Sequence, residues 1–160
     1  MALESAKRSL EEAAVETLPT PALDALPSKF YDAFLLRGLR IDLVEPGRLL
    51  CSLIIPARLL NTGNFLHGGA TASLVDLIGS AAFYTAGAKT RGTPLEIGVS
   101  YLDAAFANVA FRLLMPFVIA TKSIPTFVAC ITPLNTLPPS AHIKPGDAVV
   151  VASVELFCRS

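Results

Sequence analysis

The stretch NTGNFLHGGATASLVDLIGSAAFY, residues 61–84, places a histidine and two glycines directly before a long apolar run. The run from Gly68 to Tyr84 predicts a long apolar helix. Within it stands a single carboxylate, Asp76. The question is whether the histidine and glycines form only a helix start or also an active site.

The first amides of a helix have no intrahelical partners, and they lie at the positive end of its dipole. Glycines at positions 68 and 69 let an oxygen approach those amides closely. Gly68 and Gly69 therefore suit an oxyanion hole for a thioester or ester carbonyl, or they simply permit a tight turn. For His67, a backbone hydrogen bond at the helix start is favoured over a catalytic role.

Asp76 lies in the middle of the expected helix, where an aspartate is a poor helix former and costly to bury without a partner. Small residues flank it three and four positions away, Ser73 and Ser80 among them. Three interpretations stay open: satisfaction by a hydroxyl, close packing of a second helix, or a general base or nucleophile.

Helix geometry separates these two features. Eight residues at 1.5 Å each place Asp76 about 12 Å along the axis from Gly68. One carbonyl cannot touch both within a chain. If both serve one reaction, an antiparallel helix pair across a two-fold axis must supply them, and the site then exists only in a dimer.

Strands and a turn are expected before this helix. Alternating apolar residues over 39–43 predict one strand, residues 48–55 predict a more buried one, and residues 45–47 form the turn between them. In the loop that follows, Asn61 is either a turn residue or an amide that orients water or the carboxylate. After the helix, residues 95–106 predict another strand.

The chain is expected to contain a short helix and Pro-rich linker, residues 1–27, and then one domain, residues 28–160. A short helix is predicted to begin near Ser28 and to end at Gly38.

The segment 107–146 interrupts this pattern. Between Ala104 and Gly146 there is no acidic residue but there are six prolines, a spacing expected to exclude a long regular helix or a central strand. Its prolines and basic residues also argue against a membrane span. Residues 148–157 return to strand chemistry. We hypothesise a splice-altered product with an atypical insertion at about 107–146 and C-terminal strands that are disrupted or incomplete.

Composition restricts the class of function. Hydrophobic residues make up 52% of the 160 positions and the net charge is zero, which excludes a basic nucleic-acid surface and whole-chain disorder and favours an oligomer. Three scattered cysteines and two histidines provide few ligands for a zinc site, so no metal and no cofactor are expected. The first residues lack a secretory h-region, so a cytoplasmic location is expected, with organelles left open.

The residues NTGNFLHGGATASLVD and GVSYLDAAF resemble the small single-domain group of hot-dog fold acyl-CoA thioesterases. The resemblance runs from about residue 29 to 106 and faintly again at the C-terminus. It implies an α+β fold in which an antiparallel sheet wraps a long central helix. Dimers pair their sheets and often form tetramers.

The resemblance also implies site roles. Gly68 is similar to the oxyanion-hole donor, Asp76 to the base or nucleophile that activates water, and Asn61 to the residue that places water or the thioester. The substrate-binding residues expected beside them are His67, Gly69, Ser73 and Thr93. One position departs from the family pattern, because Pro94 stands where the group has a serine that holds the water.

The function implied is hydrolysis of acyl-CoA to a free fatty acid and CoA, in lipid metabolism, by a homodimer or homotetramer with its active site at the subunit interface. One alternative is a catalytically weak or inactive isoform that acts as a binding or regulatory subunit. Another is a hydrolase of acyl-ACP or aromatic acyl-CoA. The sequence does not set the acyl chain length or the CoA contacts.

Overall fold

The computed structural model describes residues 5, 7–8, 25–88, 93–120, 125–133 and 150–157. It divides into two compact units, residues 1–33 and 34–160. Of the N-terminal helix expected within residues 1–27, residues 5, 7 and 8 are described, and they are helical. The short helix predicted next is α3 (Phe30–Leu36), and Gly38, with φ of +91°, follows it.

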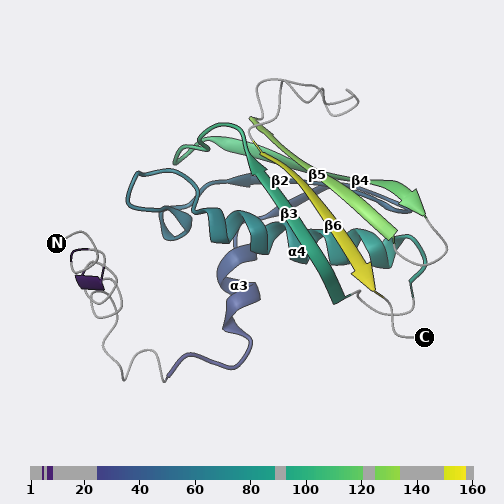
Figure 1. The fold of residues 1–160 in the computed structure, drawn as a ribbon, viewed down its shortest axis with the longest axis horizontal. Helices are drawn as coiled ribbons and strands as arrows, with labels where there is room; N and C mark the ends of the chain where they lie inside the picture. The colour runs from purple at the N-terminus through teal and green to yellow at the C-terminus, as the bar shows by residue number, and fades with distance from the viewer. Residues whose placement is uncertain are drawn as a thin grey trace. The chain divides into compact units, whose positions relative to one another are not determined.

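The second unit is an antiparallel sheet laid against one long helix, α4 (Gly68–Thr85) (Figure 1). The strand order is β1-β2-β4-β5-β6-β3, so β1 and β3 are the edges. This confirms the α+β class and the sheet around a central helix. The strands are β1 (Arg40–Glu45), β2 (Arg48–Ile54), β3 (Thr93–Tyr101), β4 (Ala110–Ala120), β5 (Pro125–Pro133) and β6 (Val150–Phe157).

The turn between β1 and β2 is tied to the end of α4. Pro46 presets φ, and Gly47 takes φ of +71°, which suits the second central position of a tight turn. The Gly47 amide donates to the Thr85 hydroxyl oxygen at 3.0 Å, and the hydroxyl lies 3.1 Å from the Glu45 carbonyl oxygen. The last turn of α4 is therefore anchored to the sheet edge.

The core lies between α4 and the concave face of the sheet. Leu74, Val75 and Ile78 of the helix are at most 2% exposed. Strand residues from both halves of the unit pack into the same cluster: Leu49, Cys51, Leu53, Phe111, Leu113, Ile131 and Ala152. Burial of this apolar surface holds the helix in place.

The segment after residue 106 contributes β4 and β5, which lie in the middle of the sheet. The expectation that its prolines exclude a central strand is therefore wrong. Pro125 and Pro133 begin and end β5, and Pro116 pairs with Arg48 at the end of the β2–β4 ladder. At such positions a missing amide interrupts the fewest ladder hydrogen bonds. Residues 121–124 and 134–149 lie outside the described residues. The hypothesis of a splice-altered insertion stays a prediction.

In the part of the chain that the structure describes, no helix is both long and apolar enough to cross a membrane.

Candidate active site

His67 caps the start of α4. Its backbone is extended (φ −62°, ψ 132°), and its Nδ1 accepts a hydrogen bond from the Gly69 amide at 2.9 Å. The acceptor must be an unprotonated nitrogen, so this ring carries its proton on Nε2. The structure thus gives His67 the helix-start role that was favoured for it, and the cap uses the Gly69 amide.

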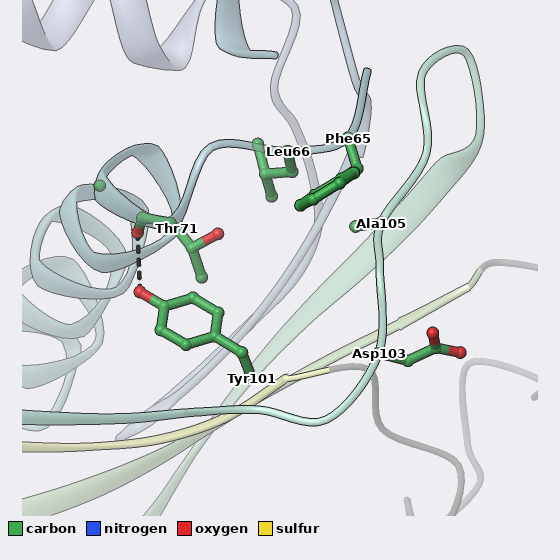
Figure 2. A pocket seen from close by; sticks show the side chains of 8 residues that line it. Phe65, Leu66, Thr71, Tyr101, Asp103 and Ala105 are labelled. Carbon is green, nitrogen blue, oxygen red and sulfur yellow. Dashed lines mark hydrogen bonds between the residues drawn. The ribbon is translucent and has the colours of Figure 1, made fainter. Parts of the chain in front are cut away.

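Gly68 is the first residue of the helix. No described residue accepts a hydrogen bond from its amide. Its carbonyl oxygen accepts one from the Tyr101 hydroxyl at 2.9 Å, drawn as a dashed line in Figure 2. A Cβ at position 68 would lie 3.2 Å from the Tyr101 Oη and 3.3 Å from its Cζ. Glycine lets the tyrosine rest against the helix start without the shift of a few tenths of an ångström that a Cβ would require.

A cavity of about 380 Å³ opens at this helix start. Its walls come from the loop before α4, the first turn of α4 and the chain after β3, and most of the lining is apolar (Figure 2). Gly68 and Gly69 are part of the wall. The other lining residues are Phe65, Leu66, Thr71, Tyr101, Asp103 and Ala105. An open amide beside an apolar cavity can polarise a carbonyl there, because little water competes for the hydrogen bond.

Asp76 is half-buried on α4 and is not one of the residues that line this cavity. The Ser80 hydroxyl donates to its Oδ1 at 3.4 Å. A hydroxyl partner was one of the interpretations left open, and it is compatible with a base, since a carboxylate retains further acceptor positions. The distance of about 12 Å along the helix from Gly68 keeps the two groups apart within one chain.

Asn61 organises the loop before the helix. Its Oδ1 accepts hydrogen bonds from the amides of Gly63 at 2.9 Å and Phe65 at 3.3 Å. This is the turn-residue interpretation of Asn61. By holding Phe65, the asparagine shapes one wall of the cavity, while its carbonyl oxygen is occupied by the backbone.

The other two expected substrate contacts lie away from the cavity. The Ser73 hydroxyl donates to the Gly69 carbonyl at 2.9 Å and so braces the first turns of α4. Thr93 begins β3, whereas Tyr101 ends it, so about 26 Å of strand separates them. Pro94 pairs with Leu156 in the edge strand β3, a position at which the ladder tolerates proline.

Sequence reasoning missed Tyr101 and Phe65 as site residues. The position of Tyr101 could have been predicted from the sequence, because side chains alternate between the two faces along a strand. Ile97 and Val99 pack against the core, and Tyr101 follows in the same series toward α4. No sequence pattern predicts the position of Phe65, since it depends on a loop that is closed by an isolated bridge between Phe65 and Phe106.

No metal centre accompanies this site within the described ranges, where no group of three histidine, cysteine or acidic side chains could hold an ion. Cys51 is fully buried in β2, and burial, followed by the charge of Asp42, raises the pKa of its thiol to about 11. It is a core residue without nucleophilic character at neutral pH.

Residues 63–112 match the model of the Thioesterase superfamily. A Schizosaccharomyces pombe protein named for esterase activity is 31% identical over 81 residues, 51% of this chain and 50% of that protein. This chain thus matches about half the length of that curated relative.

Solved structures share the fold. Thioesterase superfamily member 2 from Mus musculus has a TM-score of 0.68 at 19% identity, covering 81% of this chain and 88% of that one. A thioesterase protein from Streptococcus pneumoniae, crystallised with coenzyme A, has a TM-score of 0.65 at 19% identity, covering 76% and 89%. These likenesses identify the sheet wrapped around a long helix as the hot-dog fold.

Proposed function

Because residues 63–112 match the model of the Thioesterase superfamily and the chain has the hot-dog fold, we propose that this protein hydrolyses fatty acyl-CoA to a free fatty acid and CoA. One observation carries the proposal. The Gly68 amide has no acceptor among the described residues, and Gly68 is one of the residues that line a largely apolar cavity. A thioester carbonyl oxygen is the kind of acceptor to which this amide can donate a hydrogen bond.

In the proposed reaction, the thioester carbonyl oxygen accepts the hydrogen bond from Gly68. Asp76 of a second chain takes a proton from a water molecule as that water attacks the carbonyl carbon. The negative charge that develops on the oxygen is stabilised by the amide and by the positive end of the α4 dipole. The C–S bond then breaks, CoA leaves as its thiolate, and Asp76 donates the proton that it took from water to this thiolate sulfur.

Two chains are required by distance. Within a chain, Gly68 and Asp76 are about 12 Å apart along α4, and only Gly68 lines the cavity. Antiparallel pairing of two α4 helices across a two-fold axis brings each glycine beside the partner's aspartate. The free edge of β3 is a surface on which two sheets can join.

The test is CoA release from fatty acyl-CoA of several chain lengths, followed with a thiol reagent. Asp76→Ala should remove most turnover, because no other carboxylate on α4 can act as the base. Asp42→Ala is the matched control, since Asp42 lies on the exposed edge strand β1 and does not line the cavity at the helix start. Unchanged turnover in Asp76→Ala would reject the aspartate as the base. Tight acyl-CoA binding without any turnover in the native chain would favour the binding-subunit alternative.

A further inference from the structure

A second cavity, of about 420 Å³, lies away from the helix start. It is formed where the chain leaves α3 and enters β1, beside the end of β2 and the short 3₁₀ helix η1 (Ala57–Leu59). Three arginines, Arg37, Arg40 and Arg58, line it together with the Ser52 side of β2. Arg40 and Ser52 are directly opposite each other in the β1–β2 pair, so the register of these two strands places both beside the cavity.

None of the described residues that line the cavity is acidic. Within the described residues, the recorded salt bridge joins Arg48 to Glu45 at 3.0 Å, and neither Arg37 nor Arg40 has an acidic partner. Two of the charges influence one another, since burial and then the positive charge of Arg37 lower the pKa of Arg58. Like charges gathered without a counter-charge repel, and an anion relieves that repulsion.

Arg58 is held in place before any ligand arrives. Its Nε donates to the Phe34 carbonyl oxygen at 2.6 Å, and a terminal nitrogen donates to the Arg37 carbonyl oxygen. The guanidinium also stands 5.9 Å from the centre of the Phe34 ring. These contacts hold the Arg58 side chain in place in the cavity lining, whereas Arg37 and Arg40 are exposed.

We propose that this arginine cavity binds a phosphate group of a small molecule. Guanidinium groups match the geometry of phosphate oxygens with paired donors, and the Ser52 hydroxyl supplies a further donor. The proposal does not depend on thioester hydrolysis. The phosphate has two sources to separate: the nucleotide part of CoA, or a phosphorylated ligand unconnected with the thioester.

The test is calorimetric titration of the full chain with inorganic pyrophosphate, 3′,5′-ADP and CoA. In the double variant Arg37→Gln/Arg40→Gln, affinity should fall about tenfold or more, because hydrogen bonds from two charged donors to the phosphate are lost. Arg48→Gln is the matched control, since Arg48 is paired with Glu45 and does not line the cavity. It should bind as the native chain does. Absence of binding by all three probes, or equal losses in the double variant and the control, would overturn the proposal.

Kinetics then identify the source. If the phosphate belongs to CoA, the double variant raises KM for acyl-CoA and leaves hydrolysis of the phosphate-free acyl-pantetheine unchanged. If the ligand is separate, KM is unchanged while pyrophosphate affinity still falls. Absence of turnover in the native chain would refute the proposed hydrolase activity but would not change the calorimetric result. The proposals of thioester hydrolysis and of phosphate binding can therefore be refuted independently.

Discussion

Two inactive variants of this chain should restore each other's activity when they share a dimer. One variant, Gly68→Pro, removes the amide proposed to hold the thioester oxygen. The other, Asp76→Ala, removes the proposed base. If each active site draws Gly68 from one chain and Asp76 from the other, a mixed dimer contains one intact site and one site that lacks both groups.

Proline is a suitable replacement at this position. Gly68 is the first helical residue, where a helix tolerates proline best, and His67 already has the extended backbone (ψ 132°) that a following proline requires. Gly68→Ala is the matched control. It places a Cβ at the same 3.2 Å from the Tyr101 Oη but keeps the amide, so it separates crowding from loss of the hydrogen bond.

The expected magnitudes follow from this geometry. Loss of one oxyanion-hole donor costs about 10²–10³-fold in kcat. Random mixing of equal amounts makes about half of the dimers mixed, and each has one working site in two, so activity should return to about a quarter of the native value.

The assay is CoA release after co-expression of the two variants with different affinity tags and sequential purification on both. Dimers purified in this way are all mixed, so their activity should be about half the native value. Each variant alone should stay near background. Background activity in mixed dimers that are folded and stable would refute the two-chain site, because an active site within one chain cannot be restored by mixing.

Two further outcomes follow from the structure. Tyr101→Phe removes the hydrogen bond to the Gly68 carbonyl, a loss of about 1 kcal/mol, so kcat should fall roughly fivefold with little change in KM; Tyr84→Phe, at an exposed tyrosine near the end of α4, should have no effect. Because burial and the charge of Asp42 raise the pKa of the Cys51 thiol from 9.0 to about 11, the native state holds this proton more tightly than the unfolded state does. The free energy of unfolding, measured in urea, should therefore fall as the pH rises from about 9 to 11, and Cys51→Ala should weaken that fall.

The central helix and the first hairpin could be predicted because their signals are local. The apolar run from Gly68 needed no distant partner to be identified as a helix, and the turn at Pro46 and Gly47 has the chemistry that such turns demand. The separation of Gly68 from Asp76 is likewise a consequence of helix rise alone. These features could be obtained from the order of residues without knowing what surrounds them.

The walls of the cavity could not be obtained in this way. Tyr101 reaches Gly68 across 33 positions of sequence, and Phe65 meets Phe106 through an isolated bridge. Both contacts depend on how the sheet curves around α4, which local patterns do not encode. For the same reason the amide oxygen of Asn61 was expected to point toward either water or the backbone, and only the loop conformation decides for the backbone.

The prolines after residue 106 misled the sequence analysis because their cost depends on register. A proline destabilises a strand only where its missing amide would have donated a hydrogen bond to the neighbouring strand. Pro125 and Pro133 lie at the two ends of β5. Between them, the chain supplies Ile131 to the core that Leu74 and Val75 of α4 also enter. The helix that carries Gly68 and Asp76 is therefore packed partly by the segment that had seemed foreign to the sheet. A change that disturbs β4 or β5 should act on the proposed catalysis through the position of that helix, even though no described residue of β4 or β5 lines the cavity at the helix start.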